Sequence, residues 1–208
     1  MSRTLLSVDL DWLNGASDPL GKLRNLLRHI PPTVPSVMTV EHHEFLGQLR
    51  RWVKNGTVPI PFNLVNIDEH HDYYVNTAPY NPSGTKTNCG VWGYRIPTEW
   101  YRRYTWVHND YGEFYDWPKV KTWFEDHGIH HSERSRHRLS ELRAKIAAAV
   151  FCVSPDYLHQ DVADQMDRVV ETVVNHFGLK RAPIRKKDWH PCELDAWYMA
   201  PRPLRVKS

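Results

Sequence analysis

The stretch Asn66-Ile67-Asp68-Glu69-His70-His71-Asp72 begins at the end of a short, mainly apolar run. Asn66, Asp68, His70 and Asp72 place polar side chains at every second position. The residues before it, Phe62 to Ile67, are predicted to form a buried strand. In an extended chain, side chains at i, i+2 and i+4 point to one side, so Asp68, His70 and Asp72 should converge. Two carboxylates and an imidazole at a strand end are typical ligands of a divalent cation.

Two other predicted strands end in residues of the same kind. The segment Thr4 to Asp11 is predicted to be a buried strand that ends in the carboxylates of Asp9 and Asp11. The segment Val34 to Val40 is a second strand, and Glu41-His42-His43-Glu44 follows it directly. The carboxyl ends of parallel strands lie at one edge of a sheet, where ligands bind in α/β folds. We therefore expect the three polar clusters to meet.

The rest of the chain alternates strands with helices, which predicts one α/β domain over residues 1–208. We expect three α/β/α layers around a mainly parallel sheet. The segment 117–126 fits either a helix or a strand. Further strands are predicted at Arg103 to Val107 and Ala148 to Val153, and helices at Leu20 to Ile30, Phe45 to Val53, Ser132 to Ile146 and Val162 to Phe177.

Composition narrows the class of function. The formal net charge is only +3, so charge gives no reason to expect a nucleic-acid partner. No apolar run is long enough to cross a bilayer, and the N-terminus does not resemble a secretory signal. The three cysteines lack a metal-binding spacing and fit reduced thiols of a cytoplasmic protein. The 13 His, nine Trp and ten Tyr favour an aromatic cleft or a subunit interface, as in a homo-oligomer.

The chemistry of the six candidate ligands favours two cations over one. A single structural zinc ion prefers about four nitrogen or sulfur ligands, and this set is richer in oxygen. Four aspartates and two histidines suit two ions such as Mn²⁺, which together activate water for attack on a substrate. Each motif alone also fits a turn, a helix cap or ordinary core, so the metal interpretation depends on their convergence. The candidate ligands are Asp9, Asp11, His42 or His43, Asp68, His70 and Asp72.

These motifs resemble those of the arginase (ureohydrolase) superfamily. Asp68 to Asp72 resembles its Asp-x-His-x-Asp motif, Ser7 to Asp11 resembles its Ser-Phe-Asp-x-Asp motif, and Glu41-His42-His43 is similar to its Gly-Gly-Asp-His-Ser element. The short length and the segment Ser154 to Tyr157 are most similar to the small peptide arginases. Members of that group convert arginine to ornithine in ribosomally made precursor peptides.

The resemblance implies which residues hold each metal ion. One ion would be held by His42, Asp72, Asp68 and Asp9. The other would be held by His70, Asp11, Asp68 and Asp9, so that Asp68 and Asp9 bridge. In arginases the Asp-x-Asp element comes late in the chain, whereas here it comes first, which implies a rearranged strand connectivity.

The resemblance also implies residues for catalysis and substrate binding. The segment Ser83 to Gly90 resembles an arginase loop that carries a proton-transferring His, and this chain has Asn88 or Cys89 there; His108 is a possible substitute. Val150 to Pro155 resembles the last arginase strand, with Cys152 in the place of a guanidinium-binding glutamate. The expected catalytic residues are Asp72, His43, Cys89 and Asp156. The expected substrate-binding residues are Asn88, Asp156, Glu193 and Trp92.

The function implied is that of a peptide arginase with two Mn²⁺, acting on an arginine-containing precursor peptide and releasing urea. We expect Tyr73 to Pro97 to form a long functional loop whose aromatic residues make an open wall for the peptide. A homo-oligomer, such as a trimer, is expected, with the tail after Lys180 on the surface or on a neighbouring subunit. Two alternatives remain: a ureohydrolase of agmatine or free arginine, and a metal-binding protein that recognises a peptide without chemistry.

Overall fold

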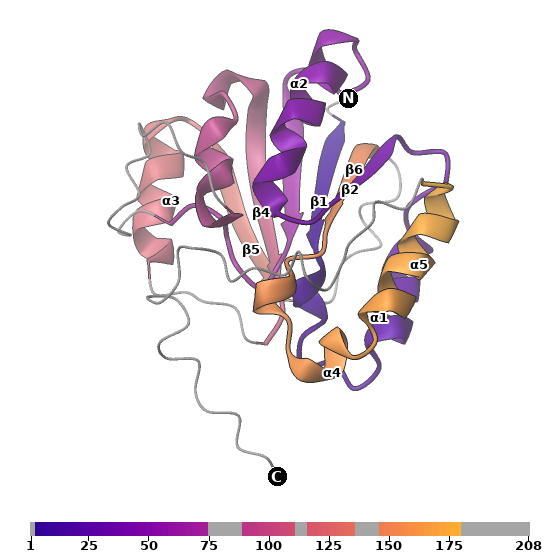
Figure 1. Ribbon diagram of the computed structural model, residues 1–208. Coiled ribbons are helices and arrows are strands. Elements are labelled where there is room, and N and C mark those ends of the chain that lie inside the picture. The colour runs from indigo at the N-terminus through magenta and orange to yellow at the C-terminus, as the bar shows by residue number, and fades with distance from the viewer. Residues whose placement is uncertain (1–2, 75–88, 111–115, 136–145, 180–208) are drawn as a thin grey trace.

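The computed structural model describes residues 3–74, 89–110, 116–135 and 146–179. Its centre is a six-stranded sheet with the order β2-β6-β1-β3-β4-β5 (Figure 1). Every neighbouring pair of strands is parallel, so the predicted α/β fold with a mainly parallel sheet is confirmed. The strands are β1 (Thr4–Asp9), β2 (Ser36–Thr39), β3 (Phe62–Ile67), β4 (Tyr101–His108), β5 (His130–Ser135) and β6 (Ile146–Cys152).

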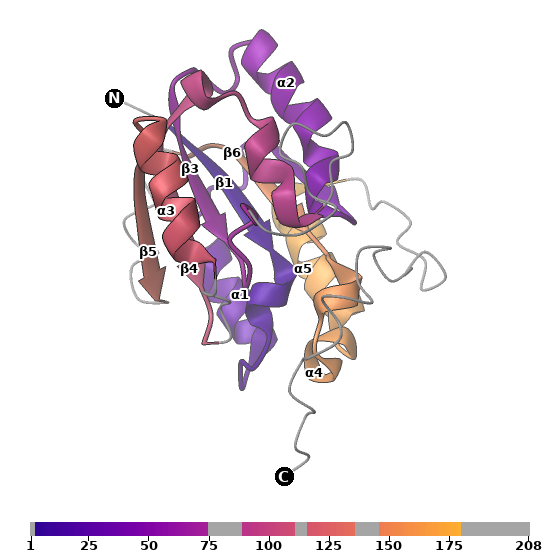
Figure 2. The same ribbon diagram turned by 90° about the vertical axis from the view of Figure 1, so that its left-hand side faces the viewer.

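Helices cover both faces of the sheet and make the three layers that the sequence predicts (Figures 1 and 2). Alternate residues of β1 point to opposite faces. Leu6 and Val8 join the core beneath α1 and α5, whereas Leu5 joins the core beneath α2 and α3. The helices are α1 (Pro19–Leu27), α2 (Leu46–Lys54), α3 (Trp117–Asp126), α4 (Gln160–Ala163) and α5 (Met166–Phe177).

The strand order reverses direction around β1. The chain passes from β1 to β2 on one side of the sheet, returns to β3 on the other, and inserts β6 last between β1 and β2. The register aligns Asp9 with Cys152, and Thr39 with Cys152, while Val8 lies beside Ile67. In parallel sheets a crevice for a ligand forms where the strand order reverses, outside the carboxyl ends.

At this edge one predicted strand is shorter than expected, and one stretch that was expected to be extended is bent. The predicted strand Thr4 to Asp11 ends at Asp9, and Asp11 lies in a 3₁₀ turn at Leu10–Leu13. Asp9 begins this turn, since its Oδ1 accepts the amide of Asp11 at 3.1 Å. The stretch from Asp68 onward is likewise bent rather than extended. The i, i+2 spacing therefore does not by itself orient these side chains.

The predicted helix from Ser132 is wrong at its start. Residues His130–Ser135 form the edge strand β5, which pairs with β4 along its length. The strand is polar because an edge strand needs little apolar surface, and pairing with β4 overrides the cap-like Ser132-Glu133 sequence. Ile146, the predicted end of that helix, begins β6, and residues 136–145 lie outside the described ranges.

Other predictions concern the helices. The ambiguous segment 117–126 is α3. The predicted helix Val162 to Phe177 is two helices, α4 and α5, and Gly178 ends the second with a φ of 63°. Within the described residues, no helix combines the length and apolar character needed to cross a bilayer.

Candidate metal centre

The six predicted ligands come from the carboxyl ends of three strands that surround the reversal point. Asp9 ends β1, Asp68 follows β3 directly, and His42 begins a 3₁₀ turn after β2. All six are buried, and the largest exposed fraction among them is 9%, at His70. The structure thus brings together side chains that are up to 63 positions apart in the sequence, from Asp9 to Asp72.

The imidazole of His42 faces three carboxylates. Its Nδ1 lies 3.2 Å from Oδ2 of both Asp9 and Asp72. The same nitrogen lies 3.3 Å from Oδ2 of Asp68. It forms no hydrogen bond with any of them, although its side chain is fully buried. A buried nitrogen surrounded by carboxylate oxygens without a hydrogen bond fits a cation placed between them. We call these four residues the His42 group.

The orientation of His42 is fixed by its other contacts. Its Nε2 lies 2.5 Å from Oγ of Ser7, a residue of β1. Its ring packs against Trp92 and Phe45, with centroids 4.7 and 6.0 Å away. Hydrogen bonding at one nitrogen and packing on the ring aim the other nitrogen at the carboxylates, as is common for a histidine that binds a metal.

This packing corrects the expected aromatic wall. Trp92, predicted to contact substrate, is fully buried against His42, and Tyr73 and Tyr74 are buried as well. These three rings therefore pack inside the protein, against residues such as His42 and His71, and do not line an open surface; Tyr80 lies outside the described residues. The physical reason is that a buried cluster of charged groups needs rigid, apolar surroundings that exclude water.

A second group forms around His70. Its Nδ1 lies 2.9 Å from Oδ2 of Asp11 and 3.7 Å from Oδ1 of Asp68. The ligand atoms of these three residues lie within 4.8 Å of one another, which is compatible with one metal ion. We call them the His70 group.

Asp68 belongs to both groups through different oxygens. Its Oδ2 faces His42 and its Oδ1 faces His70. A carboxylate in this position would be able to bridge two cations, one beside each histidine. Asp9 behaves differently, because its Oδ1 accepts the amide of Asp11 and only its Oδ2 faces His42. The resemblance implies that Asp68 and Asp9 are both bridging ligands. In the structure, Asp68 lies between the two groups, whereas Asp9 contacts the His42 group alone.

Asn66 orients two of the carboxylates, and the sequence interpretation missed it. Its Nδ2 donates to Oδ2 of Asp68 at 3.1 Å and to Oδ2 of Asp72 at 3.0 Å. Asn66 lies on β3, two residues before Asp68, and Ser7 lies on β1, two residues before Asp9. Asn66 and Ser7 are register partners in the sheet. The sequence did contain a signal for this role of Asn66. A polar residue on a buried strand, two positions before a candidate ligand, points to the same face of the sheet as that ligand.

Two residues of the candidate site have a strained, left-handed backbone conformation. Asp72 and Ser154 are the described non-glycine residues with positive φ, at 60° and 42°. Both contact the cluster: Asp72 is in the His42 group, and Ser154 donates its Oγ–H to Oδ2 of Asp9 at 2.5 Å. Left-handed conformations of such residues cost free energy and are often retained at functional sites.

The two residues between the ligands point away from the centre, as predicted. Glu69 accepts hydrogen bonds from Nδ2 of Asn14 at 2.8 Å and of Asn109 at 3.2 Å. Nε2 of His71 lies 2.6 Å from Oδ1 of Asp116. These contacts anchor the bent loop on both sides, so the ligands can face the centre without an extended backbone.

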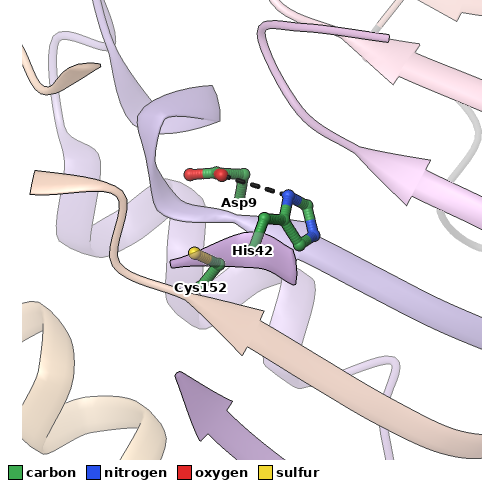
Figure 3. Close-up of side chains that lie close together, drawn as sticks. All are labelled: Asp9, His42 and Cys152. Carbon is green, nitrogen blue, oxygen red and sulfur yellow. Dashed lines mark ion pairs between the residues drawn. The ribbon is translucent and has the colours of Figure 1, made fainter. Parts of the chain in front are cut away.

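Cys152 lies at the same edge, between β2 and β1. Its Sγ is 3.1 Å from the carbonyl oxygen of Val40 and 3.1 Å from Oγ of Ser154. Figure 3 shows the sulfur near the carboxylate of Asp9 and the ring of His42. Burial, together with the charge of Asp9, raises the pKa of the thiol well above its usual range.

The carboxylates of the site carry more negative charge than the chain neutralises. Burial and the neighbouring carboxylates of Asp9 and Asp68 raise the pKa of Asp11 well above its usual range. Burial and Asp68 do the same to the pKa of Asp72. Burial also opposes the ionisation of Asp68, but His42 and His70 outweigh it and hold its pKa below the usual range. The ion-pair partners of these aspartates in the described residues are histidines.

The negative charge of the carboxylates also changes the pKa values of His42 and His70. Burial alone would lower the pKa of His42, but the carboxylates of Asp72, Asp68 and Asp9 raise it well above its usual range. The pKa of His70 is also raised, because Asp11 and Asp68 outweigh its burial. Without a metal ion, protons must supply the positive charge. Two divalent cations would supply it while four carboxylates remain ionised, so the residues present fit a pair of metal ions.

The remaining predicted residues lie around this centre or outside the described ranges. His43 is half-buried beside His42, and burial lowers its pKa. Glu41 and Glu44, the alternative ligands, form a capping interaction in which Oε2 of Glu44 accepts the amide of Glu41 at 3.0 Å. Asn88 and Glu193 lie outside the described residues, as do the side chains of Cys89 and Asp156.

Comparisons of the chain with protein-family models, with curated proteins and with solved structures find no match.

Proposed function

We propose that this protein is a metal-dependent hydrolase that holds two Mn²⁺ ions and converts arginine side chains of a peptide to ornithine, with release of urea. The observation that carries the proposal is the position of Asp68, whose two oxygens face two different ligand groups. A carboxylate shared in this way is what a two-metal hydrolytic site requires. The oxygen-rich ligand set favours Mn²⁺ among the common divalent ions.

Three further features agree with the proposal. The motifs that resemble those of arginases follow the ends of β2, β1 and β3, three strands of one parallel sheet, and surround one buried point. The ligands are oriented by Ser7 and Asn66, so the site is organised before any ion binds. When bound, a pair of divalent ions activates water and polarises the group that is attacked.

The residues of the chain would contribute orientation and charge. The most exposed ligand is His70, and the ring of Tyr157 packs edge-on against it with centroids 5.1 Å apart. A substrate would therefore approach from the His70 side of the centre. A guanidinium cation is attracted by the carboxylates there and by any acid on the loops around the site. Asp156, which immediately precedes Tyr157, is the first candidate for this role, and Glu193 is the second.

Proton transfer to the leaving amine needs a further residue near the substrate. His43 follows a candidate ligand directly, is half-buried, and carries an imidazole, the side chain that most often transfers protons in enzymes. Cys89 and Asn88 are the alternatives, since they occupy the segment that resembles the proton-transfer loop of arginases.

The test is incubation of the manganese-loaded protein with three guanidines: an arginine-containing peptide, free arginine and agmatine. We expect urea release with the peptide, and a peptide mass that falls by the elements CH₂N₂. Asp68→Asn should abolish the reaction, and Glu69→Gln, the same chemical change at the neighbouring buried carboxylate, should preserve it.

Two outcomes would contradict the proposal at different levels. Urea from free arginine or agmatine, with none from peptides, would refute the peptide substrate and favour a small-molecule ureohydrolase. Protein that holds two metal ions per chain, binds the peptide and releases no urea would refute the hydrolase and leave a metal-dependent binding protein.

A further inference from the structure

The thiol of Cys152 is a possible ligand that the proposed manganese centre does not use. Asp9, His42 and Cys152 each present a ligand atom within 4.8 Å of the others, and all three residues are buried. The arrangement follows from strand order, because β6 lies between β2, which precedes His42, and β1, which ends in Asp9. In Figure 3 the three side chains meet above the ends of these strands.

A second and independent observation points to a ligand at this place. Nδ1 of His42 is fully buried and makes no hydrogen bond with any described residue, yet Oδ2 of Asp9 lies 3.2 Å away and Oδ2 of Asp68 lies 3.3 Å away. A buried nitrogen that faces carboxylate oxygens without a hydrogen bond is well placed to contact a cation between them. A metal ion that contacts this nitrogen is also within reach of the nearby sulfur.

The present contacts of Cys152 are weak enough to be exchanged for a metal–sulfur bond. A thiol is a poor donor and acceptor, and its two contacts are the carbonyl of Val40 and the hydroxyl of Ser154, each at 3.1 Å. Ser154 also donates to Asp9, so the sulfur and the carboxylate are held by one common neighbour. When a divalent ion binds, a metal–sulfur bond forms, the S–H bond breaks and its proton leaves to solvent.

The His70 group offers no such atom, since its ligands are Asp11, Asp68 and His70. Thiolate is a soft ligand that favours Zn²⁺ and Co²⁺ over Mn²⁺, whereas carboxylates suit Mn²⁺. We propose that the two cation positions differ in metal preference: the His42 position recruits Cys152 and selects thiophilic ions such as Zn²⁺ or Co²⁺, and the His70 position does not. This inference rests on the two-metal centre of the proposed function, and modifies it at one point: where Zn²⁺ or Co²⁺ competes with Mn²⁺, the His42 position takes the thiophilic ion and the His70 position keeps Mn²⁺.

Cobalt spectroscopy tests the inference directly. Metal-free protein is titrated with Co²⁺, and absorption is recorded in the visible and near-ultraviolet regions. We expect cobalt bands in the visible region, and one sulfur-to-cobalt charge-transfer band that saturates at one equivalent. The Cys152→Ser variant should keep the visible bands and lose the charge-transfer band. The ratio of its affinities for Zn²⁺ and Mn²⁺ should fall by roughly tenfold or more. Mutating a residue that only contacts a metal ligand already lowers metal affinity by roughly tenfold, so loss of a direct ligand should have at least that effect.

Matched variants separate the sources of a sulfur signal. Cys89→Ser and Cys192→Ser remove the other two thiols of the chain, and each should keep the band. Asp11→Asn weakens the His70 position and should keep it too. Because a substitution of the buried Cys152 can alter folding, the spectrum of the unmodified protein is decisive by itself.

The outcomes distinguish this inference from the proposed function. Cobalt binding without a charge-transfer band, or a band that persists in Cys152→Ser, would overturn the role of the sulfur, while urea release would still decide the hydrolase. A chain that binds neither Co²⁺ nor Mn²⁺ would overturn both. A charge-transfer band that is lost only in Cys152→Ser, in a protein that releases no urea, would support the sulfur ligand and refute the hydrolase.

Discussion

Replacing Asp68 by Asn separates the metal centre from the fold. The two residues have nearly the same shape, so the change removes one negative charge and one acceptor oxygen. Asp68 accepts the amide of His70 at 2.7 Å and Nδ2 of Asn66 at 3.1 Å. Since it faces both ligand groups, we expect the variant to lose both metal ions, not one.

The size of the effect follows from ligand linkage. At a Mn²⁺ concentration about 100 times the Kd of each position, each ion adds about 2.7 kcal/mol to the free energy of unfolding, or about 5 kcal/mol for two. For a chain of about this size, each kcal/mol shifts Tm by about 2–4 °C, so manganese should raise the Tm of the unmodified protein by about 10–20 °C. Asp68→Asn should abolish most of that rise. Loss of one charge-assisted hydrogen bond costs the metal-free variant about 1.5–3 kcal/mol, which lowers its starting Tm.

The assay compares thermal unfolding with and without manganese, together with metal content by mass spectrometry. Glu69→Gln is the matched control, because Glu69 is also buried but accepts from Asn14 and Asn109 on the far side of the loop. The control should keep two ions and the full rise in Tm. If Asp68→Asn kept two equivalents of manganese and the same rise, the bridging role of Asp68 would be wrong.

Three further predictions address pH, the strained backbone and the core. Burial raises the pKa of Asp11 and Asp72 above the unfolded value of about 3.9, so the metal-free folded chain binds the excess protons and loses stability as pH rises through these raised values. Bound cations keep both residues ionised, so the manganese-induced rise in Tm should be larger at about pH 8 than at about pH 5.5; the opposite trend would contradict this. Ser154→Gly tolerates the positive φ but loses the hydrogen bond to Asp9, so titration should show manganese affinity at the His42 position reduced by about 10–100-fold; unchanged affinity would refute the positioning role. Leu5→Ala should cost about 2–5 kcal/mol in denaturant unfolding, because Leu5 is fully buried, with metal content unchanged; a loss of metal ions would contradict the separation of core and site.

The convergence of these side chains could be predicted from sequence because it depends largely on local patterns, while their role as metal ligands stays a prediction. Apolar runs of the right length predict β1 and β3, and although a carboxylate after one such run can serve as a turn or cap, polar clusters after three runs indicate a common site. In a parallel sheet all carboxyl ends lie at one edge, so the meeting of Asp9, His42 and Asp68 could be predicted without knowing the strand order.

The side-chain directions at the site were predicted correctly, but from the wrong backbone conformation. Alternation in an extended strand predicts that Asp68 and Asp72 face one way and Glu69 and His71 the other. The observed loop is bent, and Asp72 has a φ of 60°. The same division of directions is maintained by hydrogen bonds to Asn14, Asn109, Asp116 and Asn66, which come from other parts of the chain.

Sequence alone determined which residues are candidate ligands, most of the helices and strands, and the edge of the sheet at which the polar clusters gather, because each follows mainly from patterns among residues close in the chain. Only the tertiary structure decided which strands are neighbours. That order depends on packing between distant segments: it inserts β6 beside β1, brings Cys152 to Asp9, and makes the polar segment His130–Ser135 an edge strand. It also decided that Asp68 presents one oxygen to each ligand group, since this depends on His42 and His70 meeting the same carboxylate from two strand ends.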